Sequence, residues 1–180
     1  MADETEQKFL DAALKIFAQK GYNGATTKSI AQEAEFNEMT LFRRFKNKKN
    51  LFNCVLVHNM EKLKGNFDST LKKNKCEDSK EFLRTLITDL AKIAEDNFEF
   101  ISLTMNERSM VSGPLIAEFV NDLGAYIEKN IKVKDIDYNA LALSIFSFTY
   151  VLSIDKQYGR DVINHQEILE GFIENSILYI

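Results

Sequence analysis

The chain has 180 residues, enough for one large helical domain or two small ones that share a core. About 45% of the residues are hydrophobic, one is Pro and seven are Gly, which excludes a disordered chain and favours an all-α fold over a sheet-rich one. The net charge of −4 is unevenly spread. Residues 1–50 hold nine Lys or Arg and seven Asp or Glu, whereas residues 51–180 hold fourteen Lys or Arg and twenty Asp or Glu. A polyanion-binding surface would therefore be confined to the N-terminal part.

Three helical segments are predicted in the first fifty residues. Residues 5–20 place apolar side chains at the i, i+3, i+4 spacing of an amphipathic helix, and Gly21 follows as a C-terminal cap. Thr27 is predicted to cap a short second helix, and Asn37 is predicted to cap a third that runs over residues 38–45. A turn joins the second and third helices, which is the outline of a helix-turn-helix.

The segment TLFRRFKNKKN, residues 40–50, carries five cationic side chains and no acidic one. Asn47 is predicted to cap a fourth helix and is followed at once by two lysines, as Thr27 is followed by Lys28. A capped helix N-terminus with a nearby cation suits a phosphate group. The sequence therefore predicts that this segment binds the DNA backbone beside a reading helix, the helix that begins at Asn37 and whose exposed residues contact the bases.

Longer helices are predicted in the remainder of the chain. The fourth helix runs to about Lys72, a fifth capped by Asp78 or Ser79 follows, and Pro114 opens a further one. Residues 137–157 form the most apolar helix, whose uncharged part is too short and too rich in hydroxyl groups for a membrane span.

The expected fold class is all-α with about nine helices. We expect a three-helix DNA-binding domain over residues 1–50 and a helical ligand-binding and dimerisation domain over residues 51–180. The acidic start, MADETEQKFL, resembles neither a signal peptide nor a transit peptide, and the two cysteines are too few for a disulfide framework. These observations predict a cytoplasmic protein.

The stretch IFAQKGYNGATTKSIAQEAEFNEMTLFRRFKNKKNLF resembles the N-terminal domain of the TetR family of bacterial and archaeal transcriptional regulators. The family pattern has an aromatic residue and a Gly that close the first helix, paired hydroxyl residues before Ile-Ala, and Thr-Leu-aromatic in the reading helix. The matching residues are Phe17, Gly21, Thr26, Thr27, Ile30, Ala31, Ala34, Thr40, Leu41, Phe42, Phe45, Lys48 and Leu51. The rest of the chain agrees with the family only in its length and helicity.

The resemblance implies which residues contact DNA. The expected phosphate contacts are Thr27, Thr40, Phe42 and Lys48, and the positions that can face bases or the backbone beside them are Lys28, Glu38, Met39, Arg43 and Arg44; Asn37 and Lys46 complete the set. Glu38 could accept from a cytosine amino group, Met39 could touch a thymine methyl group and Arg43 could pair with guanine.

Two departures from the family pattern bear on this site. The turn is Ala-Glu-Phe-Asn over residues 34–37 where Ala-Gly-Val-Ser is usual, so Glu35 is expected to be strained or the turn differently shaped. Phe42 stands where Tyr is common, which removes a hydroxyl donor to phosphate.

The resemblance also implies a homodimer and a cavity for a small apolar or amphipathic ligand between the middle helices. The expected ligand-lining residues are Phe82, Phe100, Met105, Met110, Phe119, Tyr126 and Tyr150. The expected residues of a two-fold, four-helix dimer interface are Phe146, Ile154, Phe172, Ile173 and Ile177. The alternative for both sets is that they form the hydrophobic core of one chain.

We therefore expect a repressor that binds a palindromic DNA operator as a homodimer and is released by its ligand. One alternative is a helical small-molecule-binding or protein-interaction module that has lost specific DNA binding, which the altered turn, Phe42 and the overall acidity favour. An enzyme is not expected, because no catalytic triad, Gly-rich phosphate loop or paired-carboxylate pattern stands out. Cys54 and His58 could share a metal, but without an evident third ligand we expect no metal and no cofactor.

Overall fold

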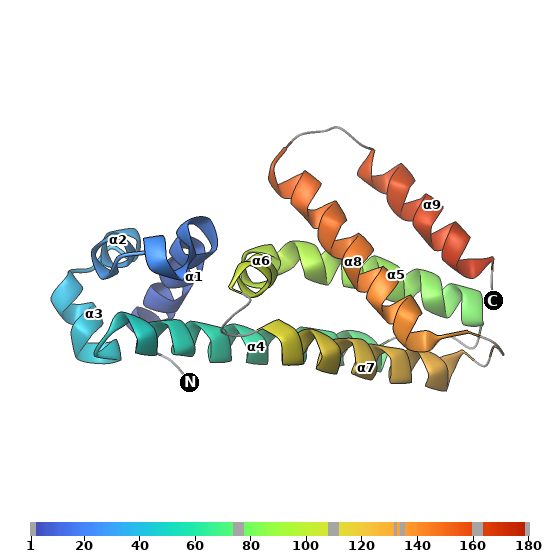
Figure 1. The fold of residues 1–180 in the computed structure, drawn as a ribbon, viewed down its shortest axis with the longest axis horizontal. Coiled ribbons are helices and arrows are strands. Elements are labelled where there is room, and N and C mark those ends of the chain that lie inside the picture. Colours follow the sequence, from blue (N-terminus) through green and yellow to red (C-terminus); the bar gives the residue numbers. More distant parts are fainter. Residues whose placement is uncertain are drawn as a thin grey trace. The chain divides into compact units, whose positions relative to one another are not determined.

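The computed structural model describes residues 3–73, 78–107, 112–131, 133, 136–159 and 164–178. These residues form nine helices and no strand (Figure 1), which confirms the predicted all-α class. The helices are α1 (Glu4–Gly24), α2 (Thr27–Glu33), α3 (Glu38–Phe45), α4 (Lys48–Lys73), α5 (Ser79–Asp96), α6 (Phe98–Asn106), α7 (Ser112–Asn130), α8 (Tyr138–Gln157) and α9 (His165–Ile177). None of the helices in these ranges is long and apolar enough to cross a membrane.

Two compact units divide the chain. The first unit comprises Met1–Lys64 and Glu99–Ser112, and the second comprises Gly65–Phe98 and Gly113–Ile180. The α6 helix therefore belongs with the N-terminal helices, and its Leu103 is buried in their hydrophobic core. The domain boundary after residue 50 stays a prediction, since α4 contributes residues to both units.

The core of the first unit forms around the apolar face of α1. Asp3 caps this helix by accepting a hydrogen bond from the backbone N–H of Glu6 at 2.9 Å. Phe9 and Phe17 are fully buried, and Phe17 meets Phe52 of α4 edge to face with ring centroids 5.0 Å apart. These contacts fix α1 as the support on which the two short helices pack.

The caps of α3 and α4 agree with the sequence, and the cap of α2 does not. Asn37 and Asn47 accept from the backbone N–H groups of Thr40 and Asn50 at 2.8 Å each, as predicted. The cap of α2 is Thr26 and not Thr27, because Thr26 Oγ1 accepts from the Ser29 N–H while Ser29 Oγ accepts from the Thr26 N–H. Thr27 is therefore the first residue inside the helix, and its hydroxyl is not part of the cap.

The turn between α2 and α3 has the strain that the missing Gly predicted. Glu35 has a φ of 61°, in the left-handed region that favours Gly. The N–H of Phe36 donates to the carbonyl of Ala31 at 2.9 Å, the six-residue bond of a Schellman motif. The Phe36 ring lies 5.2 Å from that of Phe9, so core packing holds the strained turn in place.

The second unit is built around α5. Figure 1 shows α8 and α9 lying against this helix, which buries Phe82, Leu86 and Ile87. Asp78, one of the two predicted caps, accepts from the N–H groups of Lys80 and Glu81 at the start of α5. The α7 helix begins at Ser112, so Pro114 lies within its first turn and not at its first position; a missing N–H is tolerated there.

Candidate nucleic-acid interface

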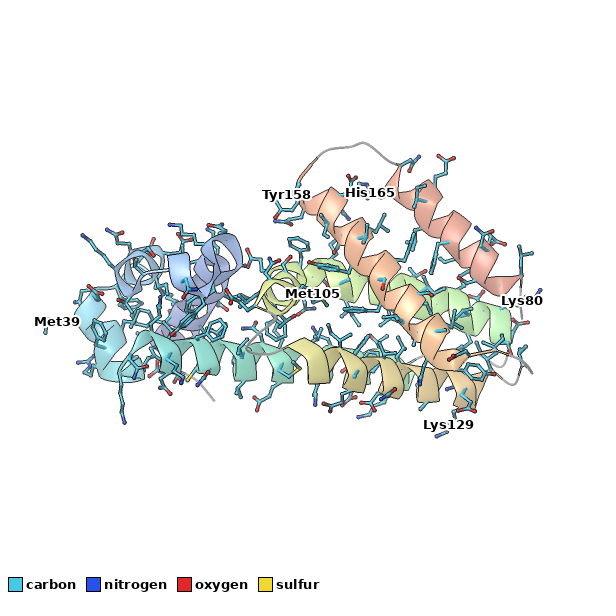
Figure 2. The ribbon with its side chains drawn as sticks, viewed as in Figure 1. Met39, Lys80, Met105, Lys129, Tyr158 and His165 are labelled. Carbon is cyan, nitrogen blue, oxygen red and sulfur yellow. The ribbon has the colours of Figure 1, made fainter. Side chains whose placement is uncertain are left out.

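The α3 helix has one face in the core and the opposite face in solvent. Leu41 and Phe45 are 0% and 2% exposed and anchor the helix on α1 and its neighbours. Met39 is 81% exposed and Phe42 is 44% exposed, and Figure 2 shows Met39 at the outer side of α3. The helix therefore presents large apolar side chains outward, which a monomeric surface helix does not need for its own folding.

Four of the predicted or neighbouring cations are exposed as well. Lys28, Arg43, Lys46 and Lys49 are exposed on α2, α3 and the start of α4. Lys46 also has a positive φ of 64°, where α3 ends and the chain turns toward α4. Exposed cations beside an outward-facing helix are suited to phosphate contacts.

Two other predicted DNA contacts have partners within the first unit. Arg44 Nη1 bonds to Asp3 Oδ2 at 2.7 Å, so it ties α3 to the cap of α1. The bond to the Glu6 backbone N–H and then the Arg44 side chain lower the pKa of the Asp3 carboxyl. The Asp3 carboxylate therefore neutralises the positive charge of Arg44, which the sequence predicted to face DNA.

Lys48 closes the turn after α1. Its Nζ donates to the backbone carbonyls of Tyr22 and Ala25 at 2.9 and 3.0 Å, and it lies 4.5 Å from the centroid of the Tyr22 ring. The side chain is half-buried. Three interactions at one ammonium group indicate that Lys48 holds the α1–α2 connection against α4.

Both predicted phosphate-binding threonines use their hydroxyl hydrogens inside the first unit. Thr27 Oγ1 donates to Glu38 Oε1 at 2.5 Å, and Thr40 Oγ1 donates to Asn37 Oδ1 at 2.9 Å. A phosphate oxygen only accepts hydrogen bonds, so it needs a hydrogen from its partner. The single hydrogen of each of these hydroxyls is already used in the internal bond. Glu38, a predicted base-reading residue, is half-buried as the partner of Thr27.

A further contact, which sequence reasoning missed, joins the residue after α6 to the last turns of α1. Glu107 Oε1 accepts from the backbone N–H of Tyr22 at 2.6 Å, although the two residues are 85 positions apart. Gly21, with a φ of 67°, brings this N–H to the carboxylate. Nothing in the local pattern around Glu107 distinguishes it from an ordinary surface carboxylate.

The predicted ligand-lining residues fall in both units. Phe100 and Met105 lie on α6, which belongs to the first unit, while Phe82, Phe119, Tyr126 and Tyr150 lie in the second. Met110 is outside the described residues.

Within the second unit the predicted aromatic residues pack closely. The Tyr126 hydroxyl donates to the Leu71 carbonyl at 2.9 Å, and its ring lies 5.5 Å from that of Phe82. The Phe119 and Tyr150 rings lie 5.4 and 6.4 Å from that of Phe146. Phe82 is buried, whereas the other rings are partly exposed, so the ligand-lining role and the alternative of a hydrophobic core both stay predictions.

A separate groove of about 340 Å³ opens in the second unit. It is lined by Ile136, Leu141, Ser144, Phe172, Asn175 and Ser176, and its wall comes mainly from α8 and α9. None of the predicted ligand-lining residues belongs to this groove.

The predicted dimer residues divide by burial. Ile173 and Ile177 are 0% and 8% exposed, so they lie in the core of the single chain. Phe146, Ile154 and Phe172 are partly exposed. The large apolar side chains that α8, α9 and the residue after α9 do expose are Leu143, Val151, Ile168 and Leu178.

The surroundings of Cys54 and His58 do not resemble a metal site. Burial raises the pKa of the Cys54 thiol, which disfavours the thiolate that a metal needs. His58 Nε2 lies 3.2 Å from the side-chain nitrogen of Gln7. Across the described ranges, no three His, Cys, Asp or Glu side chains group in a way that could hold a metal ion.

Comparison with known proteins agrees with this geometry. Residues 9–55 match the model of the bacterial regulatory proteins of the tetR family. The uncharacterized HTH-type transcriptional regulator YvkB of Bacillus subtilis is 46% identical over 52 residues, which cover 29% of this chain. The match spans only 28% of the length of YvkB, so the relationship rests on the helix-turn-helix.

Solved structures of similar fold cover almost the whole chain. The transcriptional regulator FadR of Bacillus subtilis, in complex with stearoyl-CoA, superposes with a TM-score of 0.67 at 16% identity over 97% of this chain and 98% of that one. AibR, in complex with isovaleryl coenzyme A and operator DNA, gives a TM-score of 0.74 at 14% identity over 94% and 96%. At these identities the likeness to the solved structures is one of fold. The likeness in sequence to the tetR family of bacterial regulatory proteins covers the helix-turn-helix, over residues 9–55.

Proposed function

We propose that this regulator binds duplex DNA by placing α3 in the major groove. Met39, Phe42 and Arg43 then face the base edges, while Lys28 and Lys46 lie against the phosphates on either side. The observation that carries the proposal is the solvent-facing side of α3, which combines an 81% exposed Met39 with exposed cations opposite the buried Leu41 and Phe45.

Lys48 and Arg44 have a supporting role in this proposal. Their bonds to the Tyr22 and Ala25 carbonyls and to Asp3 hold α4 and α3 against α1. They therefore set the orientation of α3 and contribute less to direct phosphate binding than the family resemblance implies.

A homodimer would present two copies of this interface to one DNA operator. The exposed Leu143, Val151, Ile168 and Leu178 support a dimer surface on α8 and α9, with the partly exposed Phe172 beside them. The two α3 helices of such a dimer would lie about 34 Å apart and would enter successive major grooves on one face of the DNA. A palindromic operator is therefore expected. The protein would act in the cytoplasm.

The ligand that we propose is an amphipathic acyl thioester. FadR and AibR, which share the fold, are described as complexes with stearoyl-CoA and isovaleryl coenzyme A. The many aromatic side chains of the second unit could take an acyl chain if some of their packing opens. A ligand that binds more tightly to the conformation in which the two α3 helices are wrongly spaced for the operator would release the protein from DNA. The protein would then be a repressor that its ligand inactivates.

Titration with random duplex DNA at several salt concentrations tests DNA binding. Because each phosphate contact releases counterions, we expect the affinity to fall steeply with salt, and Lys46→Ala to reduce the slope of the logarithmic plot by about one. Lys92→Ala, at an exposed position on α5, is the matched control and leaves the slope unchanged. Absence of binding at low salt would favour the alternative of a helical module that has lost DNA binding.

A further inference from the structure

The starts of α2 and α3 are joined by one side-chain hydrogen bond. Thr27 is the first residue of α2 and Glu38 is the first residue of α3, and Thr27 Oγ1 donates to Glu38 Oε1 at 2.5 Å. Lys28 and Met39, the next residue of each helix, are exposed. The bond therefore lies at the edge of the surface that we propose to face DNA.

The Thr27 hydroxyl has one hydrogen, and the bond to Glu38 uses it. What remains on this oxygen are lone pairs, which a phosphate oxygen cannot pair with. The neighbouring Thr26 is also engaged, since it accepts from the Ser29 N–H and donates to Ser29 Oγ. Neither member of the hydroxyl pair is therefore available to hold the DNA backbone without breaking an internal bond.

The Glu38 carboxylate gains a defined position from this bond. A Glu side chain has three rotatable bonds, and tying Oε1 to the neighbouring helix restricts them. The second oxygen, Oε2, keeps its capacity to accept hydrogen bonds. A carboxylate held at the edge of a helix in the major groove can accept a hydrogen bond from the amino group of cytosine (N4) or adenine (N6). It is repelled by the acceptor atoms of guanine (O6 and N7) and of thymine (O4).

We propose that Thr27 and Glu38 form one base-selecting unit, in which Thr27 positions the Glu38 carboxylate to read the amino group of a cytosine or an adenine. Glu38 is the specificity-determining residue and Thr27 is a positioning residue that acts through it. The inference rests on the proposed DNA-binding function and replaces the phosphate contact that the family resemblance implies for Thr27.

The test combines selection of duplexes from a random pool with affinity measurements on four duplexes that differ at the selected base pair. We expect the wild-type chain to prefer the amino-bearing base by about tenfold. Glu38→Ala should abolish the preference, and Thr27→Val, which removes the hydroxyl at nearly constant shape, should lower it several-fold. Thr27→Ser keeps the hydroxyl and should retain it.

A double variant separates positioning from independent contact. If Thr27 acts through Glu38, adding Thr27→Val to Glu38→Ala causes no further change in the ratio of affinities. If Thr27 instead holds a phosphate, Thr27→Val weakens binding to all four duplexes equally and leaves the ratio unaltered, which overturns the inference while the proposed function stands. A wild-type chain that binds no duplex overturns both.

Thermal melting checks that each variant is folded. Should Thr27→Val fail to fold, Thr27→Ala supplies the same test, because it also removes the hydroxyl and leaves Glu38 unchanged. We expect Thr27→Ala to lower the base preference several-fold. An undiminished preference in this variant contradicts the positioning role.

Discussion

Glu35 occupies a backbone conformation that its side chain makes costly. A residue other than Gly at a φ of 61° brings its Cβ close to the following carbonyl oxygen, at a cost of about 1 kcal/mol. The Phe36 N–H bond to Ala31 and the contact of Phe36 with Phe9 offset this cost. The turn thus adopts a left-handed conformation at Glu35 although no Gly is present there.

Replacing this residue should therefore stabilise the protein. For Glu35→Gly we expect the free energy of unfolding to rise by about 0.5 kcal/mol, because relief of strain exceeds the added entropy of the unfolded chain. Urea titration followed by circular dichroism measures the change. Glu35→Ala is the matched control, since it removes the side chain but keeps the strained Cβ; a gain for Ala as large as that for Gly would contradict the explanation.

At the scale of elements, side-chain caps define where several helices begin. Asp78 at α5 accepts from two backbone N–H groups, and the bonds from Glu81 and Lys80 lower the pKa of its carboxyl below the ordinary value of 3.8. A carboxyl with a lowered folded pKa stabilises the protein above its unfolded pKa. That stabilisation is lost as the pH falls through the folded pKa.

The α5 cap should therefore contribute to acid sensitivity. In wild-type protein the urea midpoint of the second unit should decrease as the pH falls below 3.8, partly because Asp78 becomes protonated. Asp78→Ser keeps a capping oxygen without a titratable group, so this part of the decrease should disappear when midpoints are measured across that range. Asp68→Ser, at an exposed position on α4, should retain the wild-type dependence. Equal pH dependence in both variants would show that the α5 cap does not titrate.

At the scale of the whole molecule, the distribution of exposed apolar side chains supports self-association. The large apolar residues exposed within the described ranges include Leu143, Val151 and Ile168 on α8 and α9. The same helices bury Ile145, Leu152 and Ile173 in the second unit, so they are apolar on two sides. A helix with apolar residues on both sides is expected at an interface between chains.

A charge on this surface should separate the proposed dimer. We expect Val151→Glu to weaken association at least tenfold, because a carboxylate at an apolar interface loses its hydration without gaining a partner. Sedimentation velocity over a range of concentrations measures the effect. Val57→Glu changes a comparably exposed valine of the first unit, 59% against 61% exposed, and should leave the association intact. A Val151→Glu chain that associates like the wild type would place the interface elsewhere.

Much of the fold could be read from the sequence because the signals are local. Helical periodicity, the caps Asn37 and Asn47 and the strain at Glu35 each depend on residues within one or two turns of each other. The exposed face of α3 follows from the same periodicity, since Leu41 and Phe45 must point inward together. For these reasons the helix-turn-helix and its outward-facing residues were predictable.

The partners of the polar side chains depend on how the helices pack. Arg44 meets Asp3 across 41 positions, Lys48 meets Tyr22 across 26 and Glu107 meets Tyr22 across 85. An amphipathic pattern indicates which side of a helix is apolar but not which neighbour covers it, as the burial of Ile173 in its own chain illustrates. The sequence alone was therefore sufficient to locate α3 and its outward face. Only the packed chain shows that Lys48 bonds to the Tyr22 and Ala25 carbonyls, because that contact depends on how α4 lies against the end of α1.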